Sequence, residues 1–174
     1  MIINLIDPKG LNRRLIEILY KYGLNTTTNF DLKEMSTDLG FKINVLMRDE
    51  LKELSPKANE LTIYSINKPV IINLQTTNDK GTHWCSLLSN NNNELYYFDP
   101  YGIEPTKEIL NFANNNKLNC KYNTLQIQPN NTKKCGQLCI YFLYLMCIEK
   151  IEFEDSILNL YEEVRELRRT NCLK

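Results

Sequence analysis

The chain contains a single histidine, His83, among its 174 residues, so any chemistry that needs an imidazole is confined to one position. Long apolar stretches are also missing, because the longest, residues 138–148, is too short to cross a bilayer. Neither sign of charge is in excess, with 21 basic and 21 acidic residues. The sequence therefore predicts no transmembrane helix and no global field that would draw the chain to nucleic acid or to an anionic membrane.

A secretory signal is not visible either, since residues 1–10 contain no basic stretch followed by an apolar run. We therefore expect the chain to stay unexported, in a reducing compartment where thiols are not paired into disulfides. Cysteine nonetheless occurs at positions 85, 120, 135, 139, 147 and 172. Cys135, Cys139 and Cys147 could share one helix face, but no histidine or second cysteine pair stands at zinc spacing from them. We expect no metal and no cofactor.

Segments rich in proline, glycine or serine, which mark linkers, do not occur, and no internal repeat is visible. Two asparagine-rich patches, residues 90–93 and 114–116, are short and flanked by apolar segments, so we expect loops there. With 43% hydrophobic residues, the chain can bury one compact core. The prediction is a single domain over residues 1–174, and we expect a monomer.

Apolar periodicity predicts both helices and strands. Apolar residues recur at helical spacing before Gly23 and again near the C-terminus, whereas short β-branched and aromatic runs fill much of the middle. The predicted helices span residues 9–22, 29–40, 105–114, 135–149 and 155–169, and the predicted strands span residues 43–47, 61–65, 70–74, 83–88, 94–98 and 122–127. This mixture predicts the α+β class.

The strands that carry His83 and Asp99 are predicted to form an antiparallel hairpin. If these two residues face each other across the ladder, Leu88 pairs with Glu94 and residues 89–93 form the loop. Directly opposed side chains have Cβ atoms about 4.5–5.5 Å apart, which lets a carboxylate hold one tautomer of an imidazole. A slip of one residue would put the two side chains on opposite faces of the sheet, so the register tests the prediction.

Cys135 stands where an apolar helix is predicted to begin, after a loop-forming segment and the basic pair at residues 133–134. We expect this pair to be surface charge, with assistance to the ionisation of the thiol as the alternative. The partial positive charge of a helix N-terminus stabilises a thiolate, particularly beside an imidazolium. Gly136 is expected to leave room for a substrate backbone near the sulfur. The following residues, 138–148, are apolar around the whole helix, which predicts a buried, rigid element that carries the thiol.

Gln128 lies at the end of a predicted strand, before the loop that leads into this helix. Its amide N–H and the backbone N–H of Cys135 would form a two-donor oxyanion hole, and Gln126 is the competing candidate on the same face of the strand. Trp84, next to the histidine, is expected to wall the cleft and bind substrate, with a place in the core as the alternative. An imidazole, a carboxylate, an amide and a thiol are together the parts that a cysteine hydrolase needs.

Several segments resemble the adenovirus-type, or adenain-like, cysteine endopeptidases, which share a fold with the peptidases of ubiquitin-like modifiers. The catalytic motifs are THW at residues 82–84, YYFDPYG at 96–102 and the Q-x6-CG-x2-C pattern at 128–139. Two further segments, NFDLKEM at 29–35 and MRDEL at 47–51, resemble the proteases of virophages and of Maverick or Polinton elements. The resemblance implies a papain-like core in which a buried central helix carries the nucleophile beside a mixed sheet with flanking helices.

By this resemblance, Cys135 is the nucleophile, His83 the base, Asp99 the residue that orients the base, and Gln128 the oxyanion donor. The adenovirus enzyme has Glu in place of Asp99, whereas the deconjugating relatives have Asp, so the orienting role is kept. The implied function is cleavage of viral capsid or core precursor proteins during virion maturation, in the host cytoplasm and in the virion. The alternatives are an isopeptidase for ubiquitin-like conjugates, or an acyltransferase with the same residues, and a binding module without activity.

The adenovirus enzyme is also stimulated by a disulfide-linked peptide and by DNA. Cys120 is the residue that could serve as an attachment point for such a peptide, but its offset from Gln128 differs from that of the family. The balanced charge gives no support to activation by nucleic acid. The expected partners are therefore the precursor polypeptides that the enzyme would cleave.

Overall fold

The computed structural model describes residues 13–21, 27–54, 69–78 and 83–169. Within these ranges the chain forms helices α1 (Arg13–Lys21), α2 (Asn29–Asp38), α3 (Lys107–Asn115), α4 (Cys135–Cys147) and α5 (Phe153–Arg169), a 3-10 helix η1 (Arg48–Leu54), and strands β1 (Asn44–Met47), β2 (Val70–Asn73), β3 (Trp84–Ser89), β4 (Glu94–Phe98) and β5 (Asn119–Tyr122). The predicted α+β class is confirmed, while the single domain stays a prediction.

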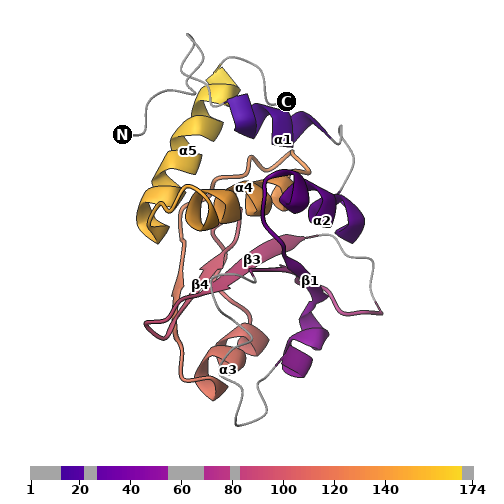
Figure 1. Ribbon diagram of the computed structural model, residues 1–174, viewed down its shortest axis with the longest axis vertical. Coiled ribbons are helices and arrows are strands. Elements are labelled where there is room, and N and C mark those ends of the chain that lie inside the picture. The colour runs from indigo at the N-terminus through magenta and orange to yellow at the C-terminus, as the bar shows by residue number, and fades with distance from the viewer. Residues whose placement is uncertain (1–12, 22–26, 55–68, 79–82, 170–174) are drawn as a thin grey trace.

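The five strands form one mixed sheet in the order β1-β2-β3-β4-β5 (Figure 1). The inner pairs, β2 with β3 and β3 with β4, are antiparallel, whereas the outer pairs, β1 with β2 and β4 with β5, are parallel. Parallel neighbours need a crossover, and α3 lies in the one between β4 and β5. The C-terminal ends of β2, β4 and β5 therefore lie beside the N-terminal end of β3, along the same end of the sheet.

Side chains along the strands alternate between two apolar cores, one on each face of the sheet. The larger core receives Ile71, Trp84, Leu88, Tyr96 and Phe98 from the sheet and is covered by α1, α2, α4 and α5. The smaller core receives Val70, Ile72, Cys85, Leu87, Leu95 and Tyr97 and is covered by α3 and η1. Figure 1 shows α3 on the opposite side of the sheet from α4.

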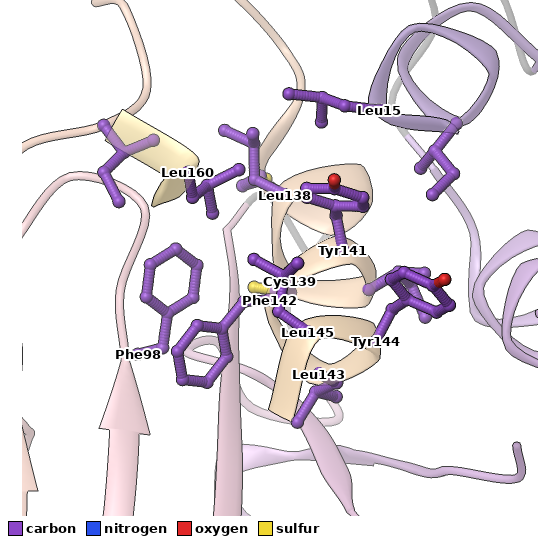
Figure 2. Packing of buried hydrophobic residues seen from close by; sticks show 14 of the residues in the cluster. Leu15, Phe98, Leu138, Cys139, Tyr141, Phe142, Leu143, Tyr144, Leu145 and Leu160 are labelled. Atoms are coloured by element: carbon purple, nitrogen blue, oxygen red, sulfur yellow. The ribbon is translucent and has the colours of Figure 1, made fainter. Parts of the chain in front are cut away.

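Helix α4 is the centre of the larger core (Figure 2). Its residues from Cys135 to Leu145 are all buried, as the uninterrupted apolar sequence predicts. Phe142 of α4 stacks on Phe98 at the end of β4, with ring centroids 4.4 Å apart. Each large apolar side chain buried in this way contributes about 1.5–3 kcal/mol, so the position of the helix is strongly held. None of the helices in the described ranges is long and apolar enough to span a membrane.

The hairpin of β3 and β4 forms, but its register differs from the predicted one by two residues. Leu88 pairs with Tyr96 rather than with Glu94. The pairing also extends further toward the loop than predicted, because the backbone N–H of Asn90 donates to the carbonyl of Glu94 at 3.1 Å. Asn93 closes the shorter loop in the left-handed region, with φ of 59°, which asparagine tolerates better than most residues.

Continued by one residue beyond the pair of Ser86 and Phe98, the corrected register puts Asp99 across from Cys85 instead of His83. A shift of two residues keeps every side chain on its predicted face, because the pleat has a period of two. His83, two residues before Cys85, therefore remains on the same side of the hairpin as Asp99. Its imidazole reaches the carboxylate along a diagonal, a separation that long side chains can span.

The predicted strand at residues 122–127 is wrong, since β5 ends at Tyr122 where that strand was expected to begin. The cause is the side chain of Asn123, which accepts a hydrogen bond from the backbone N–H of Asp99 at 2.9 Å and donates to its carbonyl at 2.8 Å. These bonds satisfy the backbone at the end of β4 in place of a further ladder. The predicted strand at residues 61–65 lies outside the described residues.

Gly102, in the turn after β4, is a position that does not accommodate a larger residue. Its φ is +71°, and an added Cβ would lie 2.7 Å from the carbonyl oxygen of Thr124. We predict that Gly102→Ala lowers the free energy of unfolding by more than the roughly 1–2 kcal/mol of a left-handed alanine, because a backbone oxygen must also move. Gly40 is the matched control, with φ of +86° but nothing within 4 Å of the Cβ position. Urea unfolding measures both variants, and equal losses would contradict the close approach at Gly102.

Candidate active site

The site is built around the carboxylate of Asp99, which is fully buried. Three groups converge on its Oδ2 atom: His83 Nε2 at 3.0 Å, Cys85 Sγ at 3.2 Å and the Tyr97 hydroxyl at 3.2 Å. The backbone N–H of Tyr101 donates to Oδ1 at 2.7 Å. Burial raises the pKa of Asp99, but the hydrogen bond and charge of His83, with the bonds from Tyr101 and Cys85, outweigh burial and hold the pKa below its usual value.

His83 lies one residue before β3, and 17% of its side chain is exposed. Nε2 lies 3.0 Å from Oδ2 of Asp99 and 3.5 Å from Sγ of Cys85. Because Nε2 faces these groups, Nδ1 is the ring nitrogen left for Cys135, which is close enough to raise the pKa of the imidazole. Burial lowers the pKa of His83, but the hydrogen bonds and charges of Asp99 and Cys135 prevail and raise it to about 9. The imidazole is therefore cationic at neutral pH and lies between a carboxylate and a thiol.

Cys135 is the first residue of α4 and is only 5% exposed. The N-terminus of a helix carries partial positive charge, which favours an anion at this position. The preceding residue, Lys134, makes no side-chain cap to the helix. The side chain at the N-cap position therefore does not occupy the first N–H groups of α4, and N–H groups at a helix N-terminus can serve an anion beside the sulfur.

Gln128 is buried and its amide is held in one orientation. Nε2 donates to the hydroxyl of Tyr101 at 3.0 Å and to the carbonyl of Thr132 at 2.7 Å, whereas Oε1 has no hydrogen-bond partner among the described residues. The backbone N–H of Gln128 donates to the carbonyl of Pro100 at 2.8 Å. One amide N–H therefore points at Tyr101, where a substrate oxygen could replace the tyrosine hydroxyl as acceptor.

Tyr101 is a site residue that sequence reasoning missed. Its ring centroid lies 5.1 Å from that of His83, and its hydroxyl is the acceptor for Gln128. Burial and the neighbouring charge of Cys135 raise the pKa of Tyr101. The residue thus connects the imidazole to the amide. Its place two residues after Asp99, within the same YYFDPYG motif, was the available signal.

Cys85 and Tyr97 were also missed, although the sequence contains a direct signal for both. Cys85 follows the predicted site residue His83 by two residues at the start of β3, and Tyr97 precedes Asp99 by two residues at the end of β4. A strand with a period of two places such neighbours on one face. The ligand atoms of His83, Cys85 and Asp99 lie within 4.8 Å of one another, so this cluster could also hold a metal ion.

The two predicted substrate-binding residues, Trp84 and Gly136, both lie in the interior. Trp84 is 7% exposed, belongs to the larger core and donates from Nε1 to the carbonyl of Thr27 at 3.1 Å, which corresponds to the core alternative. A Cβ added to Gly136 would overlap Thr27 Oγ1 and lie 2.9 Å from Leu32 Cδ2. The room expected beside Gly136 is therefore filled by the chain itself, and the glycine lets α4 pack closely against the start of α2.

The basic pair before the thiol is not simply surface charge. Lys133 is exposed, but Lys134 is 3% exposed and its ammonium donates to the carbonyl of Leu19 at 2.6 Å. Burial lowers the pKa of Lys134. Leu19 lies in the last turn of α1, where carbonyls lack partners within the helix. Lys134 therefore links the C-terminal end of α1 to the loop that leads to Cys135.

No family model matches the chain, and no curated protein matches it. Solved structures do. The ASFV pS273R protease has a TM-score of 0.61 and 12% sequence identity, and the match covers 86% of this chain and 68% of that one. A selenomethionine form of the same protease gives 0.60 and 13% over the same shares. At this identity the likeness establishes the fold and not the activity. The predicted papain-like, adenain-type fold is confirmed, while the sequence comparisons give no support to the virophage assignment.

The titration of His83 tests the geometry directly, because the chain has one histidine and its Cε1–H resonance cannot be confused with another. We predict a midpoint of about 9 in the intact protein. In Asp99→Asn the lost negative charge should lower the midpoint by about 1–3 pH units. Cys135→Ala should lower it by less. An NMR pH titration measures all three proteins, and a midpoint near the ordinary value of 6.5 in the intact protein would contradict the contacts.

Unfolding experiments give a second readout of the same shift. Because the pKa of His83 is higher in the folded than in the unfolded state, its contribution to stability is fully present below about pH 6.5 and is lost as the pH rises through about 9. The matched control is His83→Gln, which lacks this contribution. The free energy of unfolding should therefore fall more between pH 7 and pH 10 in the intact protein than in the variant, by on the order of 2–3 kcal/mol.

Proposed function

We propose that the chain is a cysteine endopeptidase in which Cys135 is the nucleophile and His83 the general acid and base. The observation that carries the proposal is the position of the imidazole, which hydrogen-bonds the buried carboxylate of Asp99 and is close enough to Cys135 for that residue to raise its pKa. The fold, shared with the ASFV pS273R protease, supports the same reading.

In the proposed reaction, the sulfur of Cys135 attacks the carbonyl carbon of the scissile bond as a thiolate, and the carbonyl oxygen becomes an oxyanion. The backbone N–H of Cys135 and the amide of Gln128 stabilise that oxygen. His83 transfers its Nδ1 proton to the departing amine, and the C–N bond breaks to leave a thioester. Water, deprotonated by His83, then hydrolyses the thioester and releases the thiol. Asp99 holds the imidazole in one orientation throughout.

The role of Gln128 requires one rearrangement of the free site. Its N–H that now donates to the hydroxyl of Tyr101 must turn to the substrate oxygen. The second N–H stays on the carbonyl of Thr132, at 2.7 Å, and keeps the amide in place while the exchange occurs. Because the side chain is buried and already ordered, little entropy is lost when the oxyanion binds.

The proposed substrates are capsid or core precursor proteins of a virus, cleaved in the host cytoplasm or in the virion. Support comes from the motifs at residues 82–84, 96–102 and 128–139, which resemble those of virion-maturation proteases, and from the fold of a protease of ASFV. The resemblance also suggests small residues, particularly glycine, just before the cleaved bond. The enzyme would act as a monomer on these polypeptides.

Co-expression with candidate capsid and core precursor proteins tests the assignment. The intact protein should produce discrete fragments of the precursors, and N-terminal sequencing of the fragments should identify the cleaved bonds. Cys135→Ala should abolish the fragments while the protein still folds, because the nucleophile is lost. The matched control is Cys120→Ala, which removes a partly exposed thiol on β5 and should leave cleavage unchanged. Fragments produced by Cys135→Ala would overturn the proposal.

A probe distinguishes the isopeptidase alternative from the endopeptidase: a ubiquitin-like protein that carries a thiol-reactive group at its C-terminus. An endopeptidase for capsid precursors should not be labelled by this probe. Rapid labelling of Cys135, together with no cleavage of precursors, would favour the isopeptidase. A small alkylating reagent serves as the control for reactivity, since it should modify Cys135 in either case.

Substitution of Gln128 tests the oxyanion hole. We predict that Gln128→Ala lowers kcat by about 100–1000-fold with little change in KM, because one of two donors to the transition state is lost. Gln126 is the matched control, since its Nε2 donates instead to the carbonyl of Gln128 at 2.8 Å and to Asn130 Oδ1 at 2.6 Å. Gln126→Ala should retain most of the activity. Equal losses in both variants, with thermal unfolding unchanged, would contradict the assignment.

A further inference from the structure

The candidate site contains a second possible function, because three ligand atoms from different side chains surround one point. Nε2 of His83, Sγ of Cys85 and Oδ2 of Asp99 are separated by 3.0 Å between nitrogen and oxygen, 3.5 Å between sulfur and nitrogen, and 3.2 Å between sulfur and oxygen. Tetrahedral Zn²⁺, with bonds of about 2.0–2.3 Å, holds such atoms about 3.3–3.6 Å apart. Small side-chain shifts would therefore suffice to admit the ion.

We propose that His83, Cys85 and Asp99 form a binding site for a thiophilic divalent cation such as Zn²⁺, and that the bound cation blocks the hydrolase. One imidazole nitrogen, one thiolate sulfur and one carboxylate oxygen are donors that zinc accepts. The inhibitory effect rests on the proposed function, whereas the binding of the cation does not.

The net charge of the buried cluster does not change when two protons leave and one divalent cation binds. Before binding, the imidazolium carries +1, the carboxylate −1 and the Cys85 thiol no charge. When the cation binds, the Nε2 proton of His83 and the thiol proton of Cys85 leave to solvent. The cation then carries +2, the thiolate −1 and the carboxylate −1, so the net charge of the cluster remains zero. Binding therefore adds no net charge to a buried region, which would otherwise be costly.

The fold arranges the ligands before any cation arrives. Cys85 is the second residue of β3 and Asp99 directly follows β4, one step beyond the pair of Ser86 and Phe98, and both side chains are fully buried. The backbone N–H of Tyr101 keeps Oδ1 at 2.7 Å, which leaves Oδ2 for the cation. The Tyr97 hydroxyl lies 3.3 Å from Sγ and 3.2 Å from Oδ2 and can continue to donate to an anionic ligand. Such outer hydrogen bonds orient metal ligands.

A cation at this position differs from one bound by the catalytic dyad. It binds Nε2 of His83 and the carboxylate of Asp99, so the two can no longer hydrogen-bond each other, and it leaves the sulfur of Cys135 uncoordinated. His83 is the ligand with exposed surface, at 17%, so the cation enters past the imidazole and inhibition should develop slowly. A site on Cys135 and His83 would instead need the thiol of Cys135. The two arrangements are separated by removing one thiol at a time.

Cobalt binding to the inactive, full-length Cys135→Ala protein tests the proposal, because Co²⁺ replaces Zn²⁺ in such sites and a Co–thiolate bond absorbs in the near ultraviolet. We expect one equivalent of Co²⁺ to bind with this absorption band, and Zn²⁺ to displace it. Adding Cys85→Ser, which keeps the volume and a hydrogen-bond donor to Asp99, should remove the band and weaken binding by more than the roughly 10–100-fold of an outer-ligand change. Adding Cys120→Ala instead should change neither.

Three results would overturn the proposal: a band that persists with Cys85→Ser, binding in the intact protein that vanishes with Cys135→Ala alone, or no stoichiometric binding in either protein. Thermal unfolding and the circular dichroism spectrum establish that the Cys85→Ser protein is folded. Because the readout is a metal–sulfur absorption in a protein without the nucleophile, its failure is independent of whether the chain cleaves peptides. Slow inhibition of the intact enzyme by Zn²⁺, reversed by a chelator, is the expected consequence.

Discussion

The buried charge of Asp99 is the constraint on which the site depends. A carboxylate without water is stable only when its oxygens are hydrogen-bonded and its charge is paired, and an unpaired one would cost several kcal/mol. The donors come from the segment before β3, from β3, from β4 and from the turn that follows it. Asn123 holds the backbone of the same residue from the segment after β5. The requirement to satisfy one side chain therefore fixes the relative positions of several chain segments.

The position of the imidazole follows from the two-faced construction of the sheet. Asp99, Cys85 and Tyr97 lie on the face that α3 covers, whereas Cys135 begins a helix on the opposite face. A histidine within the ladder would face one side only. His83 precedes the first residue of β3, at the end where several strands terminate, so its ring can contact groups that come from both faces.

Much of this arrangement could be predicted because it depends on periodicity. The apolar run after Cys135 predicts the buried helix, and the period of two predicts that His83 and Asp99 share a face even though the register was wrong by two residues. The register itself depends on a left-handed conformation at Asn93, and the end of β5 depends on side-chain bonds from Asn123. Both are tertiary choices that compete with strand propensity, and no periodic pattern encodes them.

The Cys85 thiol, which donates a hydrogen bond to Asp99, is also the ligand that would let a soft cation bind in the site. A hydroxyl at the position of Cys85 would donate to the carboxylate as well as a thiol does, yet it would be a poor ligand for soft cations. The thiol at 3.2 Å from Oδ2 and 3.5 Å from the imidazole therefore adds a property that the orientation of Asp99 does not need. In the proposed enzyme, the availability of free zinc would therefore decide whether Asp99 orients His83 as a base or whether His83, Cys85 and Asp99 together hold a cation.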